Sequence, residues 1–457
     1  MIKKLMLDLS WKVLGYGYSV EYSILKNIKT RNDLLLFQKK HLAKLLLHAY
    51  THVPYYHSLF NNYEIVSGGT IDLSKFQRIP CLTKENIRSH SHDLISREIS
   101  NRKWFYNSSG GSTGEPVRLI QDDIYMKWRI ATNYYYYKEI LEVEEPTAKK
   151  ILLWGSERDL FRGSLGITAK IYNWLSNTIW LNSFRTTEED FDTYIQVINS
   201  FKPEIIRGYA GSLNDLCRYA GQRKIPLFSP KIIVSTAENL SDTMRYGIES
   251  SFQTKVYNFY GSREVSNLAG ECKEGLLHPF VFWNYLEVLD NDNQPVHEGE
   301  EGRVVVTNLF NYSMPLIRYE IGDMAILGPE SCSCGNVLPT LKKVTGRITE
   351  HFVLRNGRMV PAEFFIHLLG VVYNEQGFIK KFQVIQEEYS QIRIKIVSSC
   401  QLTDQYQSNI ESKIKLVMGQ ECRIIWDYVD EIPKTASGKY LYTQSLVWKE
   451  NESLVVV

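Results

Sequence analysis

The chain has 457 residues, which is too long for one ordinary hydrophobic core, so we expect two or three domains. Its 44% hydrophobic and 23% charged residues are typical of a soluble globular protein, and its net charge of +2 gives no reason to expect a nucleic-acid or acidic-membrane partner. Seven cysteines without a regular framework argue against a secreted disulfide scaffold and favour a reducing cytoplasm.

The N-terminal segment is expected to be an amphipathic surface stretch. Lys3 and Lys4 with apolar neighbours imitate a leader peptide, but Asp8 and Lys12 interrupt the apolar region and no small-residue cleavage site follows. A membrane-adjacent position for residues 1–22 is the less favoured alternative. No segment has about 18 uninterrupted apolar residues, so we expect no transmembrane helix.

The next elements follow from apolar spacing and capping residues. Helical spacing predicts a helix within residues 33–59, where Pro54 either ends the helix or begins a new one. Thr83 indicates a further helix start. From residue 151 onward strands and helices alternate, which predicts an α/β sheet with parallel pairing. The expected strands are 151–154, 204–206, 231–234 and 255–259, and the expected helices are 190–201, 211–222 and 242–252.

The C-terminal third changes in texture twice. Residues 285–327 contain β-branched runs separated by turn residues, which indicates a smaller β-rich subdomain. Beyond Gly346 strand-like and helical stretches alternate over a modest length. We therefore expect an α/β protein with a large N-terminal domain (1–346) and a small α+β C-terminal domain (350–457).

The loop from Asn107 to Pro116 is the first candidate for chemistry. Its three glycines let the backbone approach an anion, and its serines and threonine add hydroxyl donors, so it suits a triphosphate. It is not a Walker A loop, because the Gly-Lys-Ser/Thr ending is missing. A flexible surface turn is the alternative interpretation, and for the loop alone the two are equally good.

Four further motifs follow the loop in a meaningful order. Each has a structural alternative, namely a turn, a buried Arg–Asp pair, a helix or strand stop, and a solvated basic loop. All five motifs in this order are very improbable by chance. The four are Tyr260-Gly-Ser-Arg-Glu264, Arg318-Tyr-Glu-Ile-Gly-Asp323, Gly346-Arg347 and Pro433-Lys-Thr-Ala-Ser-Gly-Lys439.

With these motifs the chain resembles the adenylate-forming enzymes over nearly its whole length, and most of all their phenylacetate–CoA ligase and CapK branch. Marks of that branch are Val53-Pro-Tyr-Tyr56, Pro80-Cys-Leu-Thr-Lys84, Ser109-Gly-Gly-Ser-Thr-Gly114 and the run from Tyr260 to His278. The resemblance implies that a carboxylate attacks the α-phosphorus of ATP, pyrophosphate leaves, and a thiol or amine takes the acyl group from AMP. Such chemistry depends on positioning and charge neutralisation, so no Ser-His-Asp triad is required.

The resemblance also assigns residues to the phosphates. Glu264 would bind Mg²⁺, which bridges phosphate oxygens. Lys439 would reach in from a rotating C-terminal domain, although its hinge position is Thr349 where many relatives carry Asp. Arg263 stands where most relatives have Thr and could grip phosphate as a guanidinium fork. The β- and γ-phosphates would lie against the loop residues Ser109, Gly110, Gly111, Ser112, Thr113 and Gly114, of which Gly110 replaces a common Ser.

The nucleoside would be held by residues from several motifs. Tyr260 would stack on adenine, with Ala237 and Glu238 on the other side of the base. Asp323 would accept hydrogen bonds from the ribose hydroxyls. Arg347 would add positive charge near the ribose and phosphate.

A second constellation combines three cysteines with one histidine. Cys272, His278, Cys332 and Cys334 could form a closed, structural zinc site, which the resemblance supports because relatives in this branch carry a similar set. Cys-x-Cys is tighter than the usual Cys-x-x-Cys spacing. Four unrelated residues in a reducing cytoplasm are the equally good alternative.

The sequence indicates the acyl-binding site and the substrate less specifically than the nucleotide site. By analogy with relatives Trp154, Gly208 and Tyr209 are candidates to line the acyl site, and core packing is an equal alternative. The substrate would be a small carboxylic or amino acid, and the acceptor coenzyme A, a carrier thiol or an amine. The branch suggests a role in capsular or surface polysaccharide biosynthesis, and relatives are often homodimers. The competing hypothesis is a scaffold that binds nucleotide without turnover.

Overall fold

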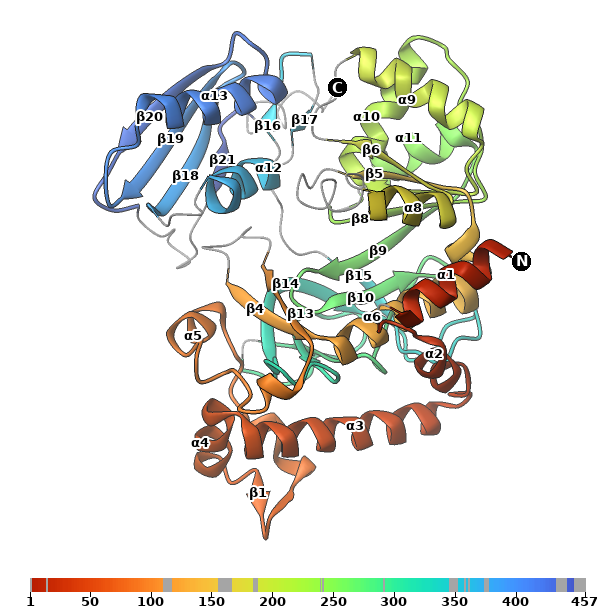
Figure 1. Ribbon diagram of the computed structural model, residues 1–457, viewed down its shortest axis with the longest axis vertical. Coiled ribbons are helices and arrows are strands. Elements are labelled where there is room, and N and C mark those ends of the chain that lie inside the picture. Colours follow the sequence, from red (N-terminus) through yellow and green to blue (C-terminus); the bar gives the residue numbers. More distant parts are fainter. Residues whose placement is uncertain are drawn as a thin grey trace.

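The computed structural model in Figure 1 describes most of the chain. None of the described helices is long and apolar enough to cross a membrane. The described residues are 2–13, 15–109, 117–154, 167–183, 188–238, 240, 242–290, 292–344, 352–356, 359–360, 362–373, 378–432 and 442–447.

Helices form the N-terminal part. Thr30 begins the long helix α3 with a capping box, in which its side chain accepts the Asp33 amide while Asp33 accepts the Thr30 amide. Pro54 begins α4 directly after α3 ends, so the helix expected within 33–59 is a pair of helices. The elements are α1 (Ile2–Val13), α2 (Ser19–Lys26), α3 (Arg31–His52), α4 (Pro54–Asn62), β1 (Val66–Ser67), β2 (Thr70–Ile71) and the 3₁₀ turn Leu73–Arg78.

One sheet of eleven strands forms the centre of the molecule. Strands β6, β5, β7, β8 and β9 pair in parallel, which confirms the expected parallel α/β region. The other strands pair antiparallel. In spatial order the strands are β12 (Asn284–Leu289), β13 (Glu301–Asn308), β14 (Tyr319–Leu327), β15 (Leu341–Val344), β11 (Leu277–Pro279), β10 (Ser266–Glu271), β9 (Val256–Ser262), β8 (Ile232–Thr236), β7 (Ile205–Tyr209), β5 (Lys150–Trp154) and β6 (Thr178–Asn182).

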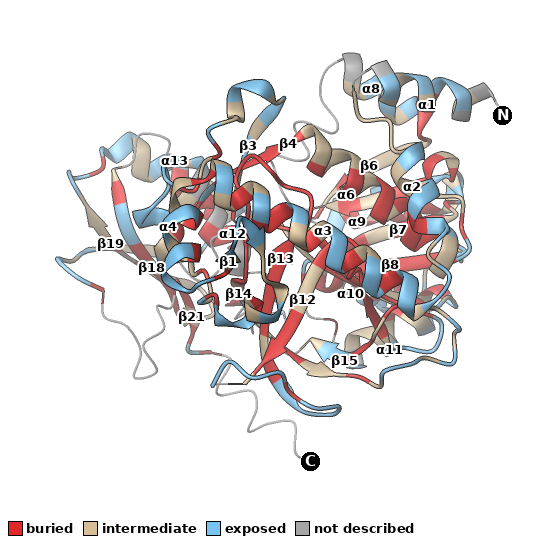
Figure 2. Ribbon diagram, turned by 90° about the horizontal axis from the view of Figure 1, so that it is seen from below, coloured by how far each residue is buried: buried red, intermediate tan, exposed pale blue. Residues whose placement is uncertain are grey.

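The β-rich stretch of the sequence extends this same sheet. Strands β12 to β14 join it through β15 and β11 and do not form a sheet of their own. Local β-branched composition indicates strands, but it does not indicate which strands pair, so the sequence did not predict that this β-rich part continues the parallel half of the sheet. Both halves of the sheet are buried at their centres, as β8 and β13 illustrate (Figure 2).

Helices cover the two halves of the sheet with separate cores. Trp128, Trp283 and Phe310 stack beneath the antiparallel half, with 3.8 Å between the ring centroids of Trp128 and Phe310. Gly270 passes so close to the ring of Tyr136 that a Cβ atom there would overlap the ring. The helices are α8 (Ile167–Leu175), α9 (Glu188–Phe201), α10 (Ala210–Gln222) and α11 (Asp242–Phe252) on the parallel half, and α6 (Asp123–Tyr135) with the π-helical turn Tyr136–Ile140 on the antiparallel half.

The C-terminal part has its own four-stranded sheet in the order β20-β19-β18-β21, with α13 packed against it (Figure 1). Its hydrophobic core also includes Tyr209 of β7. This arrangement is the expected α+β module, while the boundary between residues 346 and 350 falls outside the described residues and stays a prediction. The elements are β16 (Phe352–Val353), β17 (Met359–Val360), α12 (Ala362–His367), the π-helical turn Leu368–Val372, β18 (Ile379–Glu388), β19 (Gln391–Ser398), α13 (Asp404–Met418), β20 (Arg423–Tyr428) and β21 (Thr443–Ser445).

Candidate active site

A hairpin of β3 (Trp104–Ser108) and β4 (Arg118–Asp122) carries the glycine-rich loop. Ser109 is buried at the base of the loop, where its amide donates to the Val117 carbonyl (3.0 Å) and its hydroxyl accepts from the Val117 amide (2.9 Å). Ser109 thereby closes the base of the loop. Residues 110–116, which include Gly110, Gly111, Ser112, Thr113 and Gly114, lie outside the described residues, so their phosphate contacts stay a prediction.

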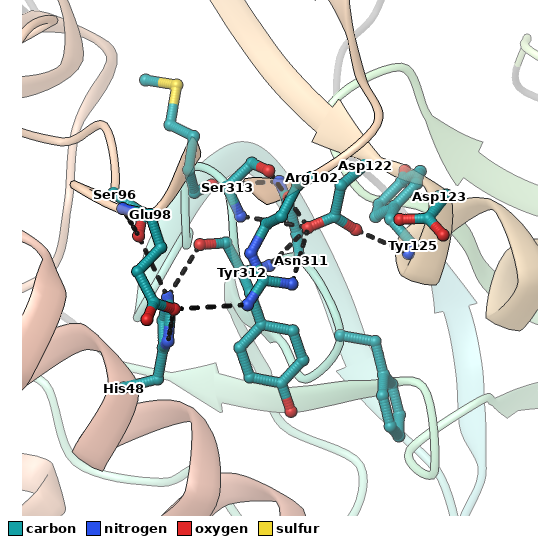
Figure 3. A network of polar contacts seen from close by, with 12 residues as sticks. His48, Ser96, Glu98, Arg102, Asp122, Asp123, Tyr125, Asn311, Tyr312 and Ser313 are labelled. Carbon is teal, nitrogen blue, oxygen red and sulfur yellow. Dashed lines mark hydrogen bonds and ion pairs between the residues drawn. The ribbon is translucent and has the colours of Figure 1, made fainter. Parts of the chain in front are cut away.

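Asp122 anchors the hairpin at the end of β4 (Figure 3). One carboxylate oxygen caps helix α6 by accepting the Tyr125 amide at 2.9 Å. The other accepts the amides of Tyr312 and Ser313 at 3.2 and 3.1 Å and lies 3.8 Å from the Arg102 guanidinium. Burial raises the pKa of Asp122, and the hydrogen bonds and Arg102 oppose that rise. The hairpin is therefore held against the body of the sheet.

The turn between β9 and β10 carries the predicted magnesium ligand and is tied to the same hairpin. The side chain of Asn107 donates to the Arg263 carbonyl at 2.9 Å. Gln121 donates to the carbonyls of Arg263 and Glu264 at 3.2 and 3.1 Å. Two motifs that are far apart in the sequence thus meet through hydrogen bonds from side chains of the hairpin to the backbone of the turn.

Glu264 is buried and has two described partners. The Lys84 ammonium lies 3.7 Å from its carboxylate, and the Tyr319 hydroxyl donates to it at 3.3 Å. Lys84 is the first residue of α5 (Lys84–Ser89), which Thr83 caps as expected. A carboxylate is a ligand that Mg²⁺ prefers, so Glu264 fits its predicted role. Lys84 had no predicted role, although it directly follows the capping residue Thr83 and ends the branch motif Pro80–Lys84.

The side chains of Tyr260, on β9, and Asp323, on β14, are in contact. The Tyr260 hydroxyl donates to an Asp323 carboxylate oxygen at 2.7 Å. Strand β9 continues through Ser262, so Tyr260 lies within the strand and not after it. This contact joins the residue expected at the adenine to the residue expected at the ribose.

Arg318, in the same motif as Asp323, has a structural position. Its guanidinium is buried, forms an ion pair with Glu287 at 3.2 Å, and donates to the carbonyls of Gln77 and Ile79 at 2.5 and 2.6 Å. The buried Arg–Asp pair that was one interpretation of this motif is a buried Arg–Glu pair in the structure.

Ala237 and Glu238 follow β8 at the edge where parallel strands end. Ala237 has φ +68°, a left-handed conformation that is unfavourable for alanine and that accumulates at functional sites. Glu238 is buried and accepts the Gly211 amide at 2.8 Å, which ties it to the start of α10. Burial raises the pKa of Glu238 to about 7.

The acyl candidates lie at neighbouring strand ends. The ring centroids of Trp154 and Tyr209 are 5.1 Å apart. A Cβ atom on Gly208 would lie 3.1 Å from Leu213 of α10, so Gly208 faces the helix, whereas its neighbours face the other side of the sheet. Arg207 was not predicted from the sequence, where its one signal is a charge inside an otherwise uncharged strand.

The four zinc candidates come together. Their ligand atoms all lie within 4.8 Å of one another, with Cys272 and Cys332 sulfurs 3.7 Å apart and the Cys334 sulfur 3.2 Å from His278 Nε2. The other ring nitrogen of His278 lies 3.3 Å from the Leu338 carbonyl, a partner that commonly orients a metal-ligating histidine. Three thiolates and one imidazole fit a closed tetrahedral zinc site, and zinc itself stays a prediction.

Arg347, Thr349 and Lys439 lie outside the described residues. Their roles therefore rest on the sequence motifs alone.

Comparisons with known proteins show what the chain as a whole is similar to. The model of the CapK C-terminal domain matches residues 352–445. Protein CapK of Staphylococcus aureus is 25% identical over 437 residues, which cover 92% of this chain and 90% of that protein. The chain is therefore similar to CapK over most of its length, and its residues 352–445 match the CapK C-terminal domain.

One more relative and one solved structure extend the likeness. The phenylacetate-coenzyme A ligase of Thermus thermophilus is 27% identical over 363 residues, which cover 75% of this chain and 76% of the ligase. The crystal structure of 2-hydroxyisobutyryl-CoA ligase in complex with 2-HIB-AMP and CoA shares the fold, with a TM-score of 0.60 at 18% identity and 91% coverage of both chains.

Proposed function

We propose that the chain activates a small carboxylic acid with ATP, releases pyrophosphate, and transfers the acyl group from AMP to the thiol of coenzyme A. The proposal rests on the contacts that bring candidate residues of separate motifs together. The turn at Glu264 is hydrogen-bonded to the base of the glycine-rich hairpin and lies near Lys84, while the Tyr260–Asp323 pair joins the two positions assigned to the nucleoside.

The proposed roles follow from charge. An oxygen of the acid attacks the α-phosphorus, and the bond to the pyrophosphate oxygen breaks with its electron pair. Glu264 would hold Mg²⁺, which neutralises phosphate charge when bound. Arg263 and the loop amides would bind the β- and γ-phosphates, and Lys439 would stabilise charge at the α-phosphate. Asp323 would bind the ribose hydroxyls, with the Tyr260 hydroxyl orienting its carboxylate, and Arg347 would add positive charge.

Coenzyme A is the acceptor that the comparisons favour. Relatives are named phenylacetate-coenzyme A ligases, and the solved structure with this fold contains an acyl-AMP and CoA. A carrier thiol and an amine are the alternatives. Nothing favours the scaffold without turnover, and the polysaccharide role and a homodimer stay predictions.

Acid-dependent pyrophosphate release by Lys439→Ala and Glu264→Gln tests the assignments. We expect Lys439→Ala to abolish release while ATP binding stays nearly intact, because Lys439 acts on the transition state. Glu264→Gln should lower release in a way that extra Mg²⁺ partly restores. Unimpaired release by Lys439→Ala would contradict its role.

A further inference from the structure

Arg207 lies in the middle of β7 with aromatic side chains around its guanidinium. The guanidinium carbon is 4.7 Å from the centre of the Phe259 ring and 5.7 Å from that of Trp154. The guanidinium also lies near Tyr137, whose pKa it lowers against the rise that burial causes. Aromatic faces attract a cation, but they offset only part of the cost of removing it from water.

The charge of Arg207 has no acidic partner among the described residues. Its Nε is buried and has no hydrogen-bond partner there. The buried Arg318 is different, since it has both a carboxylate and backbone carbonyls to bind. A half-buried guanidinium without a counter-charge is an anion-binding group, because a carboxylate matches its planar fork.

The position of Arg207 relates it to the acid. Side chains alternate along a strand, so Arg207 and Tyr209 share the face opposite to the one that Gly208 turns toward α10. Trp154, which contacts both Arg207 and Tyr209, ends the neighbouring strand β5. The guanidinium thus lies beside the two aromatic residues assigned to the acyl site.

We propose that Arg207 binds a second carboxylate of the acid substrate, so that the enzyme activates dicarboxylic acids in preference to matched monocarboxylic acids. This inference rests on the proposed function. The remote carboxylate would form a bidentate pair with Arg207, and the other carboxylate would react with ATP.

The test compares pyrophosphate release with matched pairs such as hexanoate and hexanedioate, or phenylacetate and 4-carboxyphenylacetate. Wild type should prefer the diacid of at least one pair by about 10- to 100-fold in kcat/KM, as expected for a charge-assisted hydrogen-bonded pair. Arg207→Gln should abolish this preference, mainly through a higher KM for the diacid, and change the monoacid by less than about 3-fold. Arg207→Lys should keep part of the preference, because it keeps the charge without the fork.

A control variant and three alternative results show whether Arg207 recognises the second carboxylate. Arg218→Gln removes an exposed arginine of α10 and should leave the preference unchanged. Equal losses for both acids in Arg207→Gln would mean that Arg207 binds the reacting carboxylate, and would overturn the inference. Glu157 and Asp159 lie in the segment 155–166, outside the described residues. If Arg207 formed an ion pair with either of them, Arg207→Gln would be less stable than wild type but would keep the preference for the diacid. That result would also overturn the inference. If neither the monocarboxylic nor the dicarboxylic acids support pyrophosphate release, the proposed function itself is refuted.

Discussion

Replacing Arg318 by Met should strongly destabilise the N-terminal domain. The side chain is 1% exposed and connects Glu287 on β12 with the backbone carbonyls of Gln77 and Ile79. Met has a similar length but no charge and no donor. In the variant the buried carboxylate of Glu287 therefore loses its cation, and the carbonyls of Gln77 and Ile79 lose the guanidinium as hydrogen-bond donor.

The size of the effect follows from that geometry. Removing one partner of a buried ion pair costs about 3–5 kcal/mol, which is a large fraction of a typical stability of about 5–15 kcal/mol. Burial already raises the pKa of Glu287, with Arg318 opposing the rise. Without Arg318 the pKa should rise further, so the variant should lose less stability at low pH, where Glu287 can take up a proton.

Urea denaturation followed by tryptophan fluorescence measures this loss. Arg393→Met is the matched control, because Arg393 forms a 2.6 Å ion pair with Glu387 at the surface of the C-terminal sheet and should cost less than about 1 kcal/mol. The double variant Arg318→Met/Glu287→Leu should recover part of the loss. A loss below about 1 kcal/mol in Arg318→Met, or a double variant less stable than the single one, would refute the reasoning.

Three further predictions concern the site. Glu238 binds its proton more tightly in the folded state, so its contribution to stability is full below the unfolded pKa of about 4.3 and is lost as the pH rises through about 7. Glu238→Gln should therefore be more stable than wild type at pH 8, by up to about 3 kcal/mol, and similar to wild type at pH 4. Thermal unfolding at the two pH values measures this difference. Asp323→Ala should raise the KM for ATP about 10- to 100-fold and Tyr260→Phe about 2- to 10-fold, since the first removes a charged acceptor and the second only its orienting hydroxyl; the reverse order in steady-state kinetics would count against these roles. Elemental analysis should find about one zinc per chain in wild type and nearly none in Cys334→Ser, and a zinc-free wild type after metal-free handling would exclude the site.

The sequence was sufficient for features encoded locally. Strands β5, β7, β8 and β9 and helices α9, α10 and α11 follow from short apolar runs and helical periodicity, and their alternation predicts parallel pairing. Helix α8 and strand β6, which pairs with β5, were not predicted. The pairing of β12 to β14 with the same sheet did not follow, because strand composition does not specify partners.

Contacts between distant residues were the other limit. The pairs Lys84–Glu264 and Arg318–Glu287 join side chains that are far apart along the chain, and no spacing rule connects them. Arg207 was missed for a related reason, since its significance comes from the aromatic rings that the fold brings around it. The motif residues themselves were recognisable, because a resemblance fixes their identity and order without requiring their geometry.

The central claim is that the protein forms an acyl-adenylate. The most direct measurement is ATP–pyrophosphate exchange with ³²P-labelled pyrophosphate and a panel of carboxylic, dicarboxylic and amino acids, without coenzyme A. If the protein forms an acyl-adenylate, exchange should depend on one class of acid and on Mg²⁺, and Lys439→Ala should abolish it. ATP binding without exchange for any acid would contradict the claim.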